Sequence, residues 1–430
     1  MKILICGADF ENKGAEAMLR TVQVELASRL QAVEFFLWRP AVFNHNITLS
    51  SGITPILLPY EEEKNKFIYL ILGWRIARAI WTIKEILKRG SIISLITKGN
   101  RFTAACNYYL ERTMGRVDAL IDISGFAYGD VPWADGSIQS IKPLITLCQR
   151  QDKPVFFLPQ AWGPFLNSSI RNGVKEILKG ETVKFYSRDT VSSQHLETLL
   201  EEGPILSHQD IVFNFKGGTS KQGKQILYKM GCSITRPIIG ISPNMRVFER
   251  SSGIGSSNQY IKIITRLIRH CLDKYDVDIV LQASEIKRYG ATKDDRYICS
   301  LIANVINQPD RCFMTRDFLT AEETKAIICQ FTYIIGSRFH SLVFALSNGI
   351  PGMPISWTHK YRELYSLFGL QHMVQECDKL DLEDIIIKFD RAWVEQHQHK
   401  KIIKKQLVSI QKKNDAIFNE LADMIVKKRK

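Results

Sequence analysis

The sequence predicts an α/β protein with two Rossmann-like domains that face each other across a cleft. Three observations predict this fold: short apolar runs end in turns of small residues, helical patterns follow them, and the alternation repeats in the second half. Repeated strand–turn–helix units are typical of a mostly parallel sheet. The chain has 430 residues, enough for two domains of ordinary size. Its composition, 45% hydrophobic and 24% charged, is ordinary for a globular protein.

The first strand is expected at residues 3–7. A loop then leads to Gly14, and a helix follows to about Arg29. Strand, glycine-bearing loop and helix form the opening of a Rossmann-like unit. The loop lacks both Gly-x-Gly-x-x-Gly and the Gly-Lys-Ser/Thr of a nucleoside triphosphate loop, so only its position places it beside a ligand cleft. Asn12 in this loop could cap the helix or contact a ligand.

Other strands of the first half are expected at residues 33–37, 117–125, 154–160 and 183–187, and a loop-like region is expected at 41–65. The ends of three of these strands carry Gly125, Gln160 and Arg188. Because the carboxyl ends of parallel strands meet at one edge of a sheet, we expect these three residues to face the cleft.

A polar, glycine-rich break at 216–224 separates the halves. In the second half we expect strands at 238–244, 277–282 and 332–336, with helices at 258–275, 293–306 and 341–349. The expected domains are therefore residues 1–228 and 229–385, followed by a basic helical tail at 386–430. The lysine runs of this tail are expected to lie on a solvated helix face.

The stretch 334–345 reads as a buried strand, a Gly-Ser turn and the first turns of a helix. Arg338 and His340 lie at the start of that helix, where free backbone N–H groups attract anions. Arginine supplies a fixed charge there and histidine a titratable group. The alternative is an ordinary strand–helix junction with a capping serine and a surface arginine.

The formal net charge is +14, and lysine runs near the C-terminus contribute to it. This charge favours a polyanion, an anionic membrane surface or an acidic small substrate. A basic, tryptophan-bearing helix expected at 66–88 could lie on a membrane or pack on a domain. The arginines at 75 and 78 interrupt its apolar stretch, so we do not expect it to span a bilayer. The N-terminus does not resemble a signal peptide.

The nine cysteines are scattered and include no Cys-x-x-Cys pair. This pattern predicts buried, reduced thiols in a cytoplasmic protein. Neither zinc-ligand spacing nor an acidic cluster for magnesium is visible, so we expect no metal and no bound cofactor.

Four cationic groups are expected at or just beyond strand ends: Arg188 from the first half, and Arg338, His340 and Lys360 from the second. If the halves face each other, all four can point into one cleft. Arginine binds phosphate or carboxylate through two parallel hydrogen bonds, and lysine adds a mobile point charge. The set suits a small anion that carries both phosphate and carboxylate.

An ordered set of motifs now allows a comparison with a known family. The set comprises Asn12–Ala17, Asp122–Gly125, Pro159–Pro164, Ser187–Asp189, Asp210 with Phe213, Ile241–Asn244, Gly336–His340 and Lys360. In their order and spacing these motifs resemble those of the polysaccharide pyruvyl transferases over residues 1–375. Two departures are visible: Ser124-Gly125 replaces a pair of glycines, and Gln282–Glu285 stands where members often have Pro-His.

The resemblance implies a glycosyltransferase-B-like fold, with the acceptor on the first domain and the donor on the second. It implies transfer of the pyruvyl group of phosphoenolpyruvate onto two hydroxyls of one sugar, which forms a cyclic ketal and releases phosphate. Arg188, Arg338 and His340 match the donor-binding positions, and Lys360 matches a later basic position. The pKa of histidine lies near neutrality, so we expect His340 to be the general acid or base.

Asn12, Gly14, Gly125 and Gln160 are expected to contact substrate, while His208 and His359 are weaker catalytic candidates. The expected acceptor is a surface glycan or its lipid-linked oligosaccharide precursor, which would bring the enzyme to the inner face of the membrane.

Two other functions fit parts of the sequence. One is a nucleotide-sugar-dependent glycosyltransferase of the same fold. The other is a non-catalytic basic protein that binds membrane or nucleic acid. The chain carries no nucleic-acid recognition motif, so nucleic acid is not an expected partner.

Overall fold

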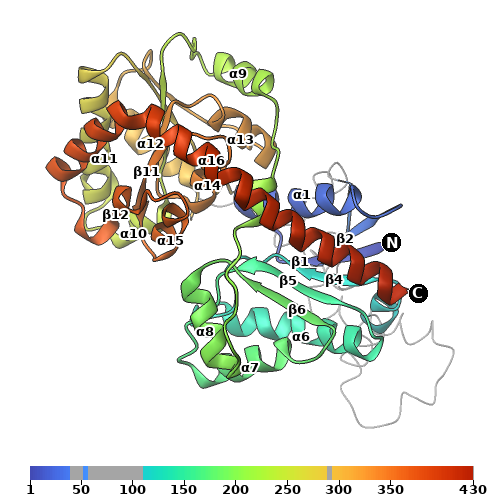
Figure 1. Cartoon of the computed structure of the whole chain (residues 1–430). Coiled ribbons are helices and arrows are strands. Elements are labelled where there is room, and N and C mark those ends of the chain that lie inside the picture. The colour runs from blue at the N-terminus through green and yellow to red at the C-terminus, as the bar shows by residue number, and fades with distance from the viewer. Residues whose placement is uncertain (39–51, 57–109, 288–292, 430) are drawn as a thin grey trace, which may run out of the picture.

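The computed structural model describes residues 1–38, 52–56, 110–287 and 293–429 (Figure 1). These residues form two six-stranded sheets. All the pairings between neighbouring strands are parallel, and helices cover the sheets. The predicted α/β class with two Rossmann-like domains is therefore confirmed.

The first sheet contains, in spatial order, β3 (Ile53–Ile56), β2 (Glu34–Trp38), β1 (Lys2–Cys6), β4 (Ala119–Asp122), β5 (Val155–Gln160) and β6 (Val183–Ser187). Its helices are α1 (Lys13–Ala27), α6 (Ala134–Arg150), α7 (Ser168–Leu178) and α8 (Thr190–Leu200). Every residue of β4 and β5 is buried. Central strands of a parallel sheet are covered on both faces, so their sequences are apolar runs and not alternating patterns.

The second sheet repeats this topology with β12 (Gln375–Glu376), β11 (Gly352–Ser356), β10 (Tyr333–Gly336), β7 (Ile238–Ser242), β8 (Asp278–Leu281) and β9 (Cys312–Met314). Its helices are α10 (Met245–Arg250), α11 (Gln259–Lys274), α12 (Asp295–Ile306), α13 (Ala321–Ile328), α14 (Phe339–Ser347) and α15 (Lys360–Ser366). In both sheets the chain reverses direction across the sheet beside its first strand, and ligands bind at such switch points.

Two local predictions were wrong. The strand β3 lies inside the region expected to be loop-like. The helix α9 (Ser220–Lys229) forms across the expected glycine-rich break, with Thr219 as its N-cap. Gly223 serves packing there, because a β-carbon at that position would lie 2.0 Å from the carbonyl oxygen of Ala326 on α13. A glycine that permits close helix packing looks in sequence like one that breaks a helix.

The C-terminal residues form one continuous helix, α16 (Leu382–Arg429), which is 48 residues long. It runs from the second half across to the first, as the red ribbon in Figure 1 shows. Phe389 on this helix is buried in the second half, while Arg29 of the first half donates a hydrogen bond to Asn419 at 2.7 Å. The lysines at 401, 405 and 412 are exposed, as expected, but the opposite face of the helix is buried against both halves.

Backbone hydrogen bonds join the two halves beside the cleft. The N–H of Lys13 donates to the carbonyl oxygen of Ser284 at 3.1 Å, and the N–H of Ile286 donates to that of Glu11 at 2.9 Å. The segment after β8, where the sequence departs from the family pattern, thus pairs with the loop before α1. This pairing fixes the distance between the carboxyl ends of the two sheets.

The described residues contain eight free cysteines, six of them buried, in agreement with the expected buried thiols. Among the described helices, none is both long enough and apolar enough to cross a membrane. The basic helix expected at 66–88 lies outside the described residues.

Candidate active site

A cavity of about 240 Å³ lies between the two halves. Its walls come from residues that directly follow the strands β4, β6, β7, β8, β10 and β11. Arg188, Arg338, His340 and Lys360 all line it, so the predicted convergence of these four side chains is confirmed.

Arg188 enters the cavity from the end of β6. Its Nη1 donates to Oδ2 of Asp210 at 2.8 Å, and its guanidinium stacks over the ring of Phe339 at 4.7 Å. Gly125 borders this side chain: it has φ of +69°, and a β-carbon on it would lie 4.0 Å from Nη1 of Arg188. One face of the Arg188 guanidinium thus packs on an aromatic ring while its charge meets a buried carboxylate.

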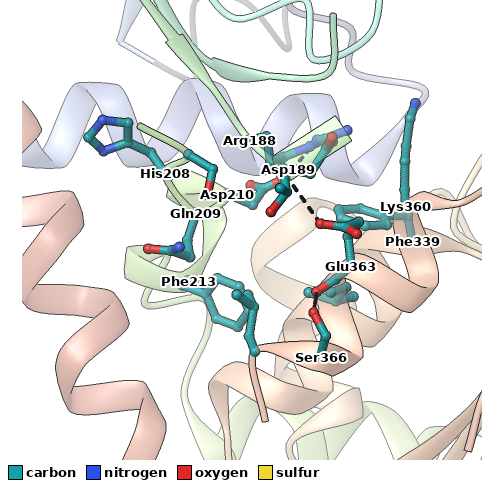
Figure 2. A pocket seen from close by; sticks show the side chains of 14 residues that line it. Arg188, Asp189, His208, Gln209, Asp210, Phe213, Phe339, Lys360, Glu363 and Ser366 are labelled. Carbon is teal, nitrogen blue, oxygen red and sulfur yellow. Dashed lines mark hydrogen bonds and ion pairs between the residues drawn. The ribbon is translucent and has the colours of Figure 1, made fainter. Parts of the chain in front are cut away.

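Asp210, which lies beside Arg188 in Figure 2, connects Arg188 to His340. It caps the 3₁₀ turn η3 (Ile211–Asn214), and its Oδ2 lies 3.4 Å from Nε2 of His340. Burial raises the pKa of Asp210. The hydrogen bond and charge of His340, the charge of Arg188 and the N–H of Val212 outweigh that effect and hold the pKa well below its usual value. Asp210 is therefore a carboxylate that places a negative charge beside both Arg188 and the imidazole of His340.

Asp210 was not among the expected site residues, although it belongs to one of the motifs quoted above. It lies outside any expected strand, so nothing in the local pattern placed it beside the two cations.

Lys360 is the first residue of α15 and is only 8% exposed. Its Nζ lies 3.1 Å from the centroid of the Phe126 ring, and it forms no ion pair within the described parts of the chain. Burial and the nearby charge of Arg188 lower the pKa of Lys360, and Asp189 opposes them only in part. A buried lysine without a carboxylate partner gains stability in its charged form when an anion binds beside it.

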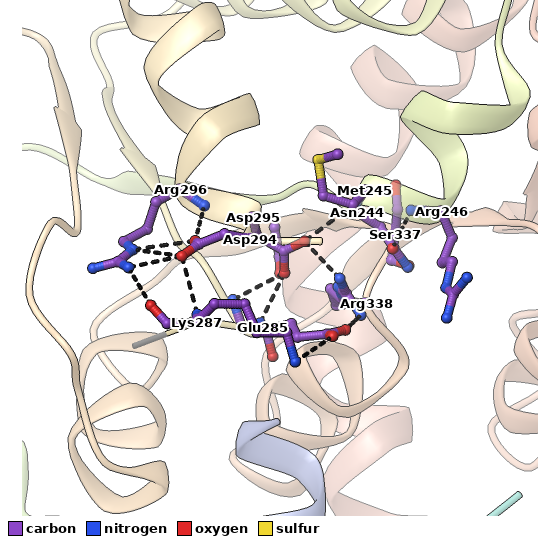
Figure 3. A network of polar contacts seen from close by, with 12 residues as sticks. Asn244, Met245, Arg246, Glu285, Lys287, Asp294, Asp295, Arg296, Ser337 and Arg338 are labelled. Atoms are coloured by element: carbon purple, nitrogen blue, oxygen red, sulfur yellow. Dashed lines mark hydrogen bonds and ion pairs between the residues drawn. The ribbon is translucent and has the colours of Figure 1, made fainter. Parts of the chain in front are cut away.

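Arg338 differs from the expected anion clamp. Its Nη1 donates to Glu285 at 2.7 Å and its Nη2 to Asp295 at 2.6 Å (Figure 3). Burial alone would lower the pKa of Arg338, but these two carboxylates raise it. Its charge is thus balanced within the protein. Its Nε is a buried donor without a hydrogen-bond partner among the described residues.

The remaining predicted residues have different surroundings. Asn12 lines the cavity and caps α1, since its side chain accepts hydrogen bonds from the N–H groups of Gly14 and Ala15. Gln160 does not line the cavity: it is fully buried and donates to Asp122 at 3.3 Å. The side chain of Gln160 is therefore buried within the first half and does not reach the cavity.

The two weaker histidine candidates do not line the 240 Å³ cavity. His208 packs against the ring of Tyr186 and lines a smaller cavity of about 60 Å³ beside Arg188. The side chain of His359 is 44% exposed, and its Nε2 lies 3.9 Å from Asp189. Burial lowers the pKa of both histidines.

Aromatic side chains form much of the cavity wall, and the sequence interpretation had not assigned them to the site. They are Phe126, Trp133, Phe339, Trp357 and Tyr361. In the sequence, the only feature that could have assigned these aromatic residues to the site is their position shortly after the end of an expected strand. No group of three or more potential metal ligands occurs in the part of the chain that the structure describes.

Comparisons with known proteins agree with this architecture. The UDP-GlcNAc 2-epimerase from Neisseria meningitidis, in a structure bound to UDP-GlcNAc, superposes with a TM-score of 0.54 at 10% identity and covers 99% of this chain and 100% of that chain. The spinosyn rhamnosyltransferase SpnG superposes with a TM-score of 0.51 at 9% identity and covers 98% of this chain and 100% of that one. These likenesses show the glycosyltransferase-B-like fold alone.

Sequence comparison is more specific. The amylovoran biosynthesis protein AmsJ from Erwinia amylovora is 21% identical over 275 residues, which cover 63% of this chain and 64% of AmsJ. Residues 12–359 match the family described as "Polysaccharide pyruvyl transferase". The matched range contains Arg188, Arg338 and His340, and it ends immediately before Lys360. The chain therefore belongs to the polysaccharide pyruvyl transferase family.

Proposed function

We propose that this protein transfers the pyruvyl group of phosphoenolpyruvate onto two hydroxyls of one sugar, forming a cyclic ketal and releasing phosphate. The observation that carries the proposal is the meeting of Arg188, His340 and Lys360 in one cavity, where Lys360 forms no ion pair with any described residue. Phosphoenolpyruvate carries a phosphate and a carboxylate within a few bonds of each other, so a compact set of cations suits it.

Lys360 and Arg188 are the proposed donor-binding groups. The lowered pKa of Lys360 arises from burial and from Arg188. A bound phosphate would supply the missing negative charge and stabilise the ammonium. Arg338 contributes by holding Glu285, the residue after Ser284 of the cavity wall.

His340 is the proposed acid. Protonation of the methylene carbon of phosphoenolpyruvate makes the neighbouring carbon electrophilic, and one sugar hydroxyl attacks it. Loss of phosphate then leaves an oxocarbenium ion that the second hydroxyl attacks. The two hydroxyls release two protons, of which one replaces the proton given to carbon and the other leaves on phosphate. Asp210 stabilises the imidazolium between these steps, and Lys360 stabilises the departing phosphate.

The proposed acceptor is a surface glycan or its lipid-linked oligosaccharide precursor. The family description and the biosynthetic name of AmsJ support an acceptor of this class. No metal or cofactor takes part in the proposed reaction.

A cytoplasmic protein in peripheral contact with an anionic membrane fits the outer face of α16. Lys401, Lys405 and Lys412 are exposed there, beside Val394 and Val408, which are 78% and 69% exposed. Basic and apolar residues on one helix face favour an anionic lipid surface. Vesicles that contain the anionic lipid phosphatidylglycerol should sediment the protein. The triple change of these lysines to glutamate should abolish sedimentation.

The decisive experiment compares phosphoenolpyruvate with a panel of nucleotide sugars by thermal shift and by phosphate release in the presence of glycan acceptors. We expect stabilisation by phosphoenolpyruvate, which Lys360→Met abolishes, and loss of turnover in His340→Gln without loss of folding. Stabilisation by a nucleotide sugar alone would contradict the proposal. It would favour the alternative of a nucleotide-sugar-dependent glycosyltransferase. The Neisseria epimerase, which shares the fold, is bound to the nucleotide sugar UDP-GlcNAc in its structure.

A further inference from the structure

An exposed tryptophan stands at one wall of the cavity. Trp133 precedes α6, is 44% exposed and lines the same cavity as Arg188 and His340. Most side chains of this size bury their rings, so an exposed indole inside a cavity has surface available for a ligand.

The indole of Trp133 is held in place before any ligand arrives. Its Nε1 donates to the carbonyl oxygen of Phe126 at 3.1 Å, and the two rings pack edge to face at 6.4 Å. Phe126 in turn carries the ammonium of Lys360 on its ring. Trp133 is therefore one aromatic ring removed from the proposed donor site, at a place where an acceptor sugar would have to lie.

A cation from the other half of the protein faces this indole. The guanidinium of Arg246, on α10, lies 5.9 Å from the Trp133 ring. It forms no ion pair with any described residue. In Figure 3 its side chain turns away from the acidic residues that hold Arg338. Arg246 thus carries an unbalanced charge next to the ring of Trp133, which itself lines the cavity.

A third group completes the wall. Trp357 also lines the cavity, and its Nε1 is a buried donor that has no hydrogen-bond partner among the described residues. An aromatic face, a cation and an unused N–H donor match a sugar ring that has one apolar face, hydroxyls at its rim and a negative substituent.

We propose that Trp133 and Arg246 form the acceptor subsite, in which the accepting sugar stacks on Trp133 and an anionic group on that acceptor pairs with Arg246. The acceptor class is therefore an anionic glycoside, with the charge on a phosphate at the reducing end or on a carboxylate of the sugar itself. The assignment to an acceptor rests on the proposed function, whereas binding of an anionic glycoside at this place does not.

The test is a set of binding titrations by saturation-transfer NMR with three kinds of probe. The probes are the 1-phosphates of glucose, galactose and mannose, their methyl glycosides, and the methyl glycosides of the corresponding uronic acids. For wild type we expect at least one charged probe to bind about fivefold more tightly than its neutral counterpart, the size of a partly exposed ion pair. Preference for 1-phosphates identifies a phosphate-linked acceptor, and preference for uronides identifies an acidic sugar.

Substitutions locate the binding. Trp133→Ala should weaken all sugar probes by about tenfold, the size of one aromatic stacking contact, while Trp133→Phe keeps most of the affinity. Arg246→Ala should abolish only the preference for charged probes. Matched controls are Tyr228→Ala, an aromatic residue 58% exposed on α9, and Arg266→Ala on the exposed side of α11. Both should bind like wild type.

The subsite is overturned if Trp133→Ala binds every probe like wild type, or if Arg246→Ala keeps the preference for charge. Stabilisation by phosphoenolpyruvate, measured on the same variants, separates the two proposals. If wild type binds charged glycosides but not phosphoenolpyruvate, the subsite stands and the donor assignment fails.

Discussion

Gly14 and His340 lie in direct contact across the interface of the two halves. A β-carbon on Gly14 would lie 1.9 Å from Nδ1 of His340 and 2.7 Å from its Cβ. The first turn of α1 therefore forms the surface against which the proposed catalytic imidazole rests. Gly14 was expected to contact substrate, but the structure places it against the histidine instead.

Gly14→Ala should displace His340. Because both the ring and the Cβ of the histidine would clash, the side chain cannot escape by a small rotation. We expect kcat for ketal formation to fall by about 100-fold, as for other small displacements of a reacting group. The imidazole NMR signals of His340 should shift as well. Gly136→Ala on α6 is the control, since nothing lies within 4 Å of its β-carbon. Wild-type kcat in Gly14→Ala would refute the contact.

Asp210→Asn should destabilise the fold as well as the reaction. It leaves the side chain of Arg188, which is 7% exposed, without its counter-charge, and such changes cost about 3–5 kcal/mol. Asp276→Asn is the matched control: Asp276 pairs with Arg236 at 2.7 Å but is 80% exposed, so its loss should cost at most about 1 kcal/mol.

The same variant has a defined pH dependence. The folded-state pKa of Asp210 lies below its unfolded value of 3.8. Its stabilising effect is therefore complete above that value and is lost as the pH falls through the folded pKa. In urea unfolding, the difference in the free energy of unfolding between wild type and Asp210→Asn should be constant near neutral pH. This difference should become smaller only below about pH 4. If this difference in the free energy of unfolding already disappears at pH 6, the lowered pKa of Asp210 is contradicted.

Arg338→Met should act mainly on stability. It leaves the fully buried Asp295 without a cation and Glu285 with Lys287 alone, which should lower the free energy of unfolding by about 3–5 kcal/mol. The folded variant should still be stabilised by phosphoenolpyruvate. Arg391→Met is the control, because the side chain of Arg391 is 79% exposed. A stable Arg338→Met protein that has lost phosphoenolpyruvate binding would restore the anion-clamp interpretation.

Asn414 links the C-terminal helix to the site. It is fully buried on α16, and its Nδ2 donates to the carbonyl oxygen of Asp210 at 3.1 Å and to Oδ1 of Asn214 at 3.2 Å. Asn414→Ala should cost about 1–3 kcal/mol through the unsatisfied carbonyl. It should also lower kcat more than it raises KM for phosphoenolpyruvate. Gln406→Ala, at an exposed position on the same helix, should change neither the stability nor kcat by a measurable amount.

Asp122 should make the stability fall as the pH rises. Burial raises the pKa of Asp122 to about 6, although hydrogen bonds from Ser124, Tyr128 and Gln160 oppose it. The protonated form is favoured in the folded state, so this contribution is complete below pH 3.8 and is lost as the pH rises through about 6. Calorimetry between about pH 5 and pH 7, where unperturbed carboxyls are mostly ionised, should show this slope in wild type and not in Asp122→Asn.

Local pattern alone sufficed for much of this site. Arg188, Arg338 and Lys360 each follow the end of a buried apolar run, and the carboxyl ends of parallel strands open on one edge. That rule brings side chains together that are far apart in the chain. The rule does not say whether a side chain at a strand end lines the cavity or is buried. Gln160 also lies at a strand end, but it is buried and does not line the cavity.

The sequence by itself determined the two strand–helix sheets, the edge at which the site lies and the cations that meet there. These follow from periodicity and from the rules of parallel topology, which act over a few residues at a time. Only the tertiary structure decided which charges are already balanced. Arg338 is paired through Glu285 and Asp295, which lie 53 and 43 residues away. Asp210 is held by a helix about 200 residues further on. Partners at such separations leave no local pattern, because only the packing of the whole chain brings them within hydrogen-bond distance.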